Sequence, residues 1–183
     1  METLEQRYAR QFDRIDLDKS GFLDLWDLAR QEEEVVRLAG VAADSPEGKH
    51  VAVQMRGGFI SLIRLADSNK DAKVSKAEFV AALSQAARDK RFPSVVQERV
   101  RFAFDLVDSN HNGAIGSDEL AAFLARAHSV TDPAKIKVIH EDVKKAAPNG
   151  RVMLAEVEKV VTDYYLDENG DTELGRALAD LAM

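Results

Sequence analysis

The sequence predicts an all-α fold. Apolar residues recur three or four positions apart, as in the stripe of Tyr8, Phe12 and Ile15, which is the spacing of one helix face. Strand-forming residues occur only as isolated Leu, Val or Ile within breaks rich in Gly, Asp and Asn. The stretches 76–91 and 117–128 are rich in good helix formers. We therefore expect helices joined by short polar loops.

In the N-terminal half, one helix is expected to end before residue 16. A second apolar stripe leads to another break and consists of Phe59, Leu62, Ile63 and Ala66. Gly57 and Gly58 interrupt this helical pattern, at about 1 kcal/mol each relative to Ala, so a kink or close packing is expected there.

In the C-terminal half, the segment 91–93, Arg-Phe-Pro, is the expected boundary between the two halves. Helix starts are predicted at Ser94, which has Gln97 three residues later, and at the Thr-Asp-Pro segment 131–133. The apolar stripes that follow consist of Val100, Phe104 and Val107, and then of Leu120, Phe123 and Leu124.

Composition narrows the classes of function. The chain has 183 residues, of which 45% are hydrophobic, enough for one sizeable core or two small ones. It contains no Cys, which excludes a thiolate metal site and suits the cytoplasm. A formal charge of −7 disfavours nucleic acid and favours cations or basic partners. The start offers no signal-peptide core, and no apolar run approaches the roughly 20 residues of a membrane helix, so no membrane is expected.

Three breaks share one pattern. They read DLDKSGFLDLWD (16–27), DSNKDAKVSKAE (67–78) and DSNHNGAIGSDE (108–119). Each begins with Asp and places Asp, Asn or Ser at positions three and five. Each then has a small residue at position six, an aliphatic at eight and an acid at twelve. Acidic breaks between helices are often only turns and caps, but three full copies favour a repeated binding loop.

Such a loop suits a hard divalent cation. Calcium takes about 6–8 oxygen ligands in loose geometry. Side chains at positions one, three and five of a curled loop point inward, position seven offers its carbonyl, and position twelve can add two carboxylate oxygens. The bend at position six favours positive φ and hence Gly. The aliphatic at position eight lets two loops pair through a short strand.

This pattern resembles the EF-hand, and the long interval between the first two loops resembles sarcoplasmic calcium-binding proteins and their calerythrin-like bacterial relatives. The resemblance implies four helix–loop–helix units in two paired lobes that form one compact body, with short β pairing between loops. The lobes would span 1–91 and 92–165, and 166–183 would form a tail with a C-terminal helix. It also implies calcium bound at three loops.

The resemblance assigns the ligands by position in each loop. Loop one would use Asp16, Asp18, Ser20, the Phe22 carbonyl, Asp24 and Asp27. Loop two would use Asp67, Asn69, Asp71, the Lys73 carbonyl, Ser75 and Glu78. Loop three would use Asp108, Asn110, Asn112, the Ala114 carbonyl and Glu119.

Each loop departs from the pattern in one respect. Asp27 replaces the usual Glu at position twelve of loop one, and its shorter arm makes this site friendlier to Mg²⁺. Ala72 replaces Gly at the bend of loop two, where a left-handed Ala costs roughly 1–2 kcal/mol. Loop three has only two acids, Asp108 and Glu119, and therefore the least charge to hold a dication.

The fourth break, KAAPNGRVMLAE (145–156), keeps the frame of the pattern without its ligands. With Gly150 at the bend and Glu156 at position twelve, Val152 takes the pairing position, in a register that is ambiguous by one residue. The first, third and fifth positions are then Lys145, Ala147 and Asn149. Because an ammonium group repels a cation, we expect this loop to pair with loop three and to bind no ion.

Other candidate sites are weaker. The segment 167–171 begins like a metal loop but lacks the later positions, so we interpret it as a linker, with Asp171 or Thr172 capping a final helix. His111 occupies position four of loop three, where side chains face solvent. The sequence has no G-x-S-x-G, P-loop or dinucleotide-binding motif. We therefore predict no enzyme.

Two roles remain open: a calcium buffer, or a sensor that exposes an apolar groove and binds a protein partner when loaded with calcium. Promiscuous sensors present Met-rich grooves, whereas two of the four Met here are the chain ends. The tail carries a helical stripe that could fill a groove, made of Leu174, Leu178 and Leu181. These features favour a monomeric buffer.

Overall fold

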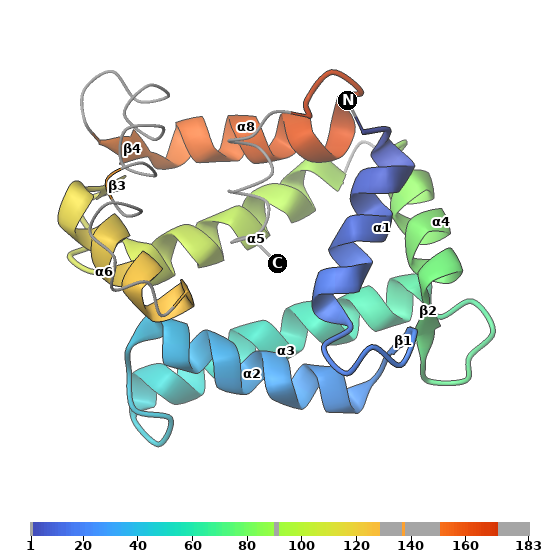
Figure 1. Cartoon of the computed structure of the whole chain (residues 1–183), viewed down its shortest axis with the longest axis horizontal. Helices are drawn as coiled ribbons and strands as arrows, with labels where there is room; N and C mark the ends of the chain where they lie inside the picture. Colours follow the sequence, from blue (N-terminus) through green and yellow to red (C-terminus); the bar gives the residue numbers. More distant parts are fainter. Residues whose placement is uncertain (1, 90–91, 129–136, 138–150, 172–183) are drawn as a thin grey trace.

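The computed structural model describes residues 2–89, 92–128, 137 and 151–171 (Figure 1). The N-terminal half runs α1 (Leu4–Ile15), β1 (Phe22–Leu23), α2 (Leu25–Ala39), α3 (Pro46–Ala66), β2 (Val74–Ser75) and α4 (Lys76–Ala86). The C-terminal half contains α5 (Phe92–Val107), β3 (Ala114–Ile115), α6 (Ser117–His128), β4 (Val152–Met153) and α8 (Leu154–Leu166). The predicted all-α class is confirmed. The predicted tail helix and the first half of the fourth loop lie outside the described residues.

Helix starts follow from capping. Thr3 caps α1 in a capping box with Gln6, Ser45 caps α3 ahead of Pro46, and Ser75 caps α4 in a box with Glu78. In each case a side-chain oxygen accepts a backbone N–H that the first helical turn leaves without a partner.

The predicted start of α5 at Ser94 is wrong, because the helix begins at Phe92. Pro93 then lies in the first turn, where its missing N–H costs no hydrogen bond. The helix α5 therefore starts within the segment 91–93, which the sequence predicted to be a boundary between the halves.

Two short antiparallel ladders join the loops in pairs. In the first, Leu23 lies opposite Val74, and both side chains are fully buried. In the second, Ile115 lies opposite Val152. Each of these four residues holds the eighth position of its loop, so the aliphatic residues pair as predicted, and Val152 resolves the register of the fourth segment.

The hydrophobic core is shared by both halves of the chain. Figure 1 shows α1 beside α4, α5 beside α8, and α2 beside α3, and these pairs are in contact. Contacts between the halves include those of α1 with α8 and of α2 with α5 and α6. The rings of Phe12 and Phe79 meet edge to face, with centroids 5.7 Å apart. The division into lobes at residue 91 stays a prediction, because one cluster of buried residues spans both halves.

The C-terminal end of α8 is held by a buried arginine. Arg7, in α1, is fully buried, and its guanidinium donates to the carbonyl of Tyr164 and, at 2.9 Å each, to those of Asp167 and Glu168. The Tyr8 hydroxyl donates to the Tyr165 carbonyl at 2.6 Å, and burial raises the pKa of Tyr8 to about 12. The last carbonyls of a helix have no partner within it, so Arg7 and Tyr8 supply donors from α1.

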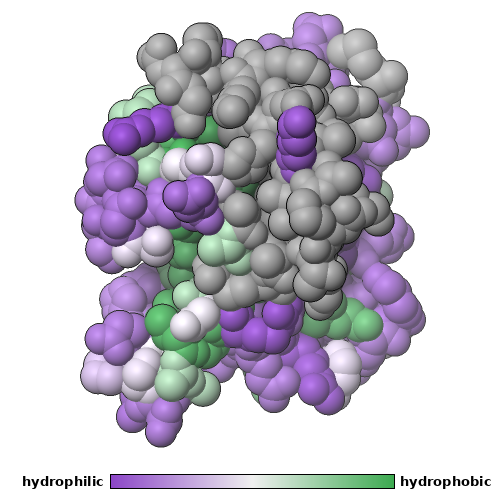
Figure 2. Space-filling model, turned by 60° about the vertical axis from the view of Figure 1, so that its left-hand side comes forward, coloured by the Kyte–Doolittle hydropathy of each residue, from purple (hydrophilic) through white to green (hydrophobic). Residues whose placement is uncertain are grey.

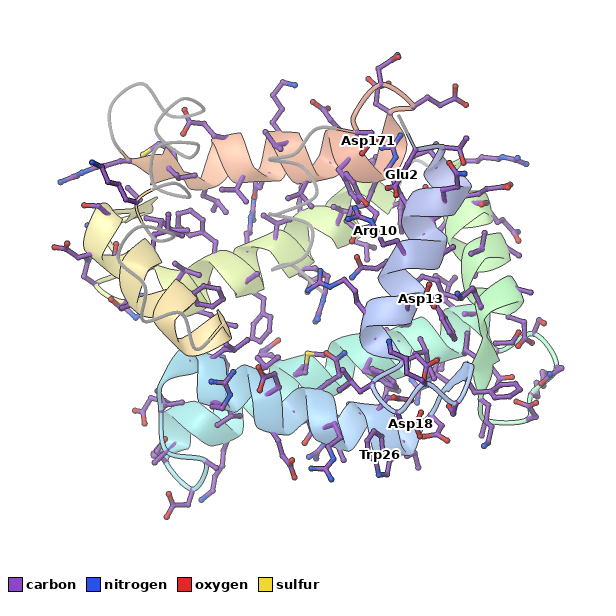
Figure 3. All side chains as sticks on the ribbon, viewed as in Figure 1. Glu2, Arg10, Asp13, Asp18, Trp26 and Asp171 are labelled. Carbon is purple, nitrogen blue, oxygen red and sulfur yellow. The ribbon has the colours of Figure 1, made fainter. Side chains whose placement is uncertain are left out.

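The segment 167–171, predicted to be a linker, packs against the N-terminus. The Asp171 carboxylate accepts the Glu2 backbone N–H at 2.6 Å, and both residues lie beside Arg10 in Figure 3. A side chain at Gly170 would overlap the Asp163 carbonyl, so this close turn requires Gly.

The described surface on one face of the molecule is mainly hydrophilic. On the face shown in Figure 2, hydrophobic areas are small and lie between larger hydrophilic ones. None of the helices in the described ranges combines the length and apolar character that crossing a bilayer requires.

Candidate metal centre

The three predicted loops share one backbone conformation. Within the described ranges, every non-glycine residue with positive φ lies in one of these loops. At position four, φ is 59° for Lys19, 61° for Lys70 and 54° for His111. At position six, φ is 83° for Gly21, 65° for Ala72 and 78° for Gly113. The expected left-handed Ala72 is therefore observed, and His111 is exposed as predicted.

The carboxylate at position one is oriented by two backbone N–H groups in every loop. Asp16 accepts from Ser20 at 3.0 Å and from Gly21 at 2.9 Å. Asp67 accepts the equivalent pair at 3.2 and 3.1 Å, and Asp108 does so at 3.1 and 2.8 Å. Asp16 and Asp108 are buried. The loop therefore curls around its first side chain.

The acid at position twelve is held from two sides. One oxygen of Asp27, Glu78 and Glu119 accepts the N–H of position nine, at 3.0, 3.0 and 2.9 Å respectively. The other oxygen accepts from position two: the Leu17 N–H at 2.9 Å, the Ser68 hydroxyl at 2.8 Å, or the Ser109 hydroxyl at 3.2 Å. These hydrogen bonds connect the start of each loop to the first turn of the helix that follows it.

Within the described residues, loop one is where three carboxylates come together. Asp16, Asp18 and Asp27 each offer an oxygen, and these atoms lie within 4.8 Å of one another. Asp27 is fully buried, and burial raises its pKa above the usual value. The backbone N–H of Ser20 lowers the pKa of Asp18. Carboxylates this close repel one another unless a cation lies between them, so the donor set fits a hard divalent ion.

The remaining ligands predicted for loop one lie around this cluster. The Ser20 hydroxyl donates to the Phe22 carbonyl at 3.0 Å. Asp24 caps α2 by accepting the Trp26 N–H at 2.8 Å. Figure 3 shows Asp18 and Trp26 at the same end of the molecule. Asp24 also faces Lys73 of loop two, whose ammonium nitrogen lies 3.5 Å from a carboxylate oxygen.

Loop two has the same hydrogen bonds in a more exposed setting. Asn69 accepts the Asp71 N–H, and Asp71 accepts the Lys73 N–H, both at 2.9 Å. The pKa of Glu78 is lowered to about 2, chiefly by the Ser75 backbone N–H and then by the hydroxyls of Ser68 and Ser75. Glu78 is therefore ionised and ready to accept a cation at neutral pH.

Loop three repeats the arrangement with amides. Asn110 accepts the Asn112 N–H at 3.0 Å, and Asn112 accepts the Ala114 N–H at 2.9 Å. The Gly116 backbone N–H is the main cause of the lowered pKa of Glu119. Amide oxygens carry less charge than carboxylate oxygens. Loop three therefore forms the same hydrogen bonds with fewer negative charges.

The fourth segment keeps part of this frame. Glu156 accepts the Met153 N–H at 2.9 Å, which repeats the bond between positions twelve and nine. Lys145, Ala147 and Asn149, on which the prediction of an empty loop depends, lie outside the described residues.

Sequence reasoning missed the serines at position two of loops two and three. Ser68 and Ser109 donate to the acids at position twelve. The signal was present in the sequence as the repeated start Asp-Ser-Asn in both loops.

The chain resembles known proteins over most of its length. The profile described as "EF hand" matches residues 9–30 and 101–124, which contain loops one and three. The sarcoplasmic calcium-binding protein beta chain of Penaeus sp. is 27% identical over 164 residues, covering 84% of this chain and 83% of its own. Residues 9–30 and 101–124 are therefore similar to EF hands.

Two further relatives agree with this EF-hand similarity. Calerythrin of Saccharopolyspora erythraea is 24% identical over 162 residues, covering 87% of this chain and 90% of its own. The solved sarcoplasmic calcium-binding protein of amphioxus has a TM-score of 0.67 at 18% identity and covers 97% of this chain and 96% of its own. The latter likeness shows the fold, and EF-hand loops are built for calcium.

Proposed function

We propose that this protein binds calcium reversibly at loops one, two and three and acts as an intracellular calcium buffer. The observation that carries the proposal is the single loop conformation, repeated three times, with the acids at positions one and twelve held by backbone N–H groups. The ligands would be the residues assigned to each loop by position. The chain would act by binding alone, without catalysis.

Charge and backbone strain would set the order of affinity. Loop one has four acids at ligand positions, loop two has three, and loop three has two. Loop two also carries the left-handed Ala72. We therefore expect loop one to fill first and to accept Mg²⁺ as well, since Asp27 offers a shorter arm than Glu.

Binding would stabilise the fold rather than open it. An ion that binds only the folded chain adds about 2.7 kcal/mol per site at 100 times its dissociation constant. The paired strands and the shared core couple each loop to its neighbours. A buffer of this kind gains thermal stability with calcium and exposes little new apolar surface.

Calorimetric titration with calcium, with and without millimolar Mg²⁺, tests the number of sites and their selectivity. We expect three bound ions, with one site strongly weakened by Mg²⁺. Fewer than three ions would contradict the three-site assignment. Thermal unfolding and binding of a hydrophobic dye, measured in the same samples, test the buffer role: the unfolding temperature should rise while dye binding stays constant.

A calcium sensor is the second candidate, and one observation favours it. Large apolar side chains gather at loop one, where Leu25 is 75% exposed and Trp26 is 45% exposed, and Leu17 and Phe22 are also exposed. Such a surface could receive a protein partner. Retention on an apolar resin only in the presence of calcium would support the sensor and overturn the buffer.

A further inference from the structure

A cavity of about 600 Å³ lies between the two halves of the molecule. Residues of α1, α2, α3, α4, α5 and α8 line it, so it lies where both halves meet. Its walls are mainly apolar and include Phe59, Leu62, Val96, Phe102 and Val161. The volume is within the range of roughly 300–1,000 Å³ typical of sites for small molecules. None of the calcium ligands predicted above lines it.

Among the described residues that line this cavity, one side chain is cationic, that of Arg99 in α5. Its neighbours are soft and uncharged: the Met55 sulfur, 3.6 Å from a guanidinium nitrogen, and the Phe102 ring, whose centroid is 5.4 Å from the guanidinium carbon. A side chain at Gly58 would overlap the guanidinium, so this Gly gives Arg99 its space.

Arg99 has no strong anionic partner among the described residues. The described part of the chain places no carboxylate within ion-pair distance of it. Burial lowers the pKa of Arg99, against the smaller opposing effect of Glu98, an exposed neighbour that also borders the cavity. A partly buried guanidinium without a paired anion is costly, and a carboxylate that accepts two of its N–H groups removes that cost.

We propose that this cavity binds an apolar carboxylic acid of the fatty-acid class, with its carboxylate on Arg99 and its chain along the apolar walls. Among the described lining residues, Arg99 is the one cation and favours an anionic group, while the largely apolar remainder of the wall, which Glu98 borders, favours hydrocarbon. This site is separate from the calcium loops and does not depend on their occupancy.

The C-terminal segment 172–183 is the competing occupant, because its apolar stripe could also enter a groove. The stripe of Leu174, Leu178 and Leu181 carries no anion for Arg99, which favours a carboxylic acid as the occupant.

Laurate, titrated into the delipidated full-length chain by calorimetry, tests the site. Dodecanol, which has the same chain length without the carboxylate, is the matched control ligand. We expect laurate to bind at least about tenfold more tightly than dodecanol, because only the acid forms charge-assisted hydrogen bonds with Arg99. Equal affinities, or the absence of laurate binding, would overturn the proposal without the need for any variant.

Arg99→Met and Gly58→Ala then locate the site. Arg99→Met keeps an unbranched apolar side chain and should weaken laurate about tenfold or more while leaving dodecanol unchanged. Gly58→Ala should weaken laurate by displacing the guanidinium. Unchanged laurate binding in Arg99→Met would place the ligand elsewhere and refute the assignment. Binding that appears only after removal of 172–183 would identify the tail as the occupant and refute it as well.

The titrations are run both in EDTA and in calcium, so that this proposal and the calcium proposal can fail separately. We expect laurate to bind in both conditions. A requirement for calcium would contradict the independence of the two sites.

Discussion

Loop one and loop two adopt the same turn with different residues at its two most constrained places. At the bend, Gly21 and Ala72 have φ of 83° and 65°. At position twelve, Asp27 is fully buried and its pKa is raised by burial, whereas Glu78 is only partly buried and its pKa is lowered to about 2. Yet the acid at position one accepts the same two N–H groups in both loops.

This difference shows where the loop tolerates substitution. The frame depends on hydrogen bonds from the backbone to positions one and twelve, and these bonds form whichever residue holds the bend. The two loops differ in the backbone strain at position six and in the burial of the acid at position twelve. The predicted difference between the loops is therefore one of affinity and ion preference, with the architecture unchanged.

Removing the first acid should have the largest effect. In Asp16→Ala and Asp67→Ala, the loop loses a predicted metal ligand that also accepts two backbone N–H groups, each charge-assisted bond worth about 1.5–3 kcal/mol. Each variant should therefore bind one calcium ion fewer in a calorimetric titration. Asp13→Ala is the matched control, since Asp13 lies just outside loop one, with a carboxylate oxygen 2.5 Å from the Lys76 ammonium nitrogen. An unchanged number of bound calcium ions in Asp16→Ala would contradict the assignment of a calcium site to loop one.

Exchanging the residues at the bend should shift affinity about tenfold in opposite directions. Ala72→Gly relieves a left-handed Ala, at roughly 1–2 kcal/mol, and should strengthen loop two. Gly21→Ala imposes that strain on loop one and should weaken it, with no steric contribution, because a Cβ there would meet no atom within 4 Å. Competition with a fluorescent chelator measures both constants. The same direction of change in both variants would contradict a strain-based difference.

Exchanging the residues at position twelve should alter ion preference by a smaller factor. Asp27→Glu supplies a longer arm and should raise the preference of loop one for calcium over Mg²⁺ on the order of a few-fold, with Glu78→Asp acting oppositely in loop two. Trp26 is the single Trp of the chain and immediately precedes Asp27. Its fluorescence, followed during calcium titrations in Mg²⁺, reports on loop one. If neither exchange changes selectivity, arm length does not set ion preference here.

The ion pair between the two loops should have the smallest effect. The Lys73 ammonium lies 3.5 Å from a carboxylate oxygen of Asp24, and both side chains are partly exposed. Such pairs contribute about 0–1 kcal/mol and are screened by salt. Lys73→Met should strengthen calcium binding at loop one less than about fivefold, as measured by Trp26 fluorescence at low salt. A weaker loop one in this variant would show that Lys73 supports the site.

Local features of the loops could be predicted from the sequence because their causes lie within twelve residues. The bends at Gly21 and Gly113 and the strained Ala72 follow from position in the loop. The pairing of Leu23 with Val74 and of Ile115 with Val152 follows from the aliphatic residue at position eight.

Features created by the tertiary fold could not be predicted. Arg7 resembles any surface residue of an amphipathic helix, yet it is buried against carbonyls of residues 164, 167 and 168. Arg99 likewise has no local signal, because its position depends on Gly58 in another helix. The start of α5 was misplaced because the capping pattern at Ser94 is equally compatible with a helix interior.

A crystal structure of the chain saturated with calcium, with the ions located by anomalous scattering, tests the central claim most directly. We expect three ions, one in each of the segments 16–27, 67–78 and 108–119, and none in 145–156. A loop without an ion among the first three, or an ion in the fourth, would contradict the account.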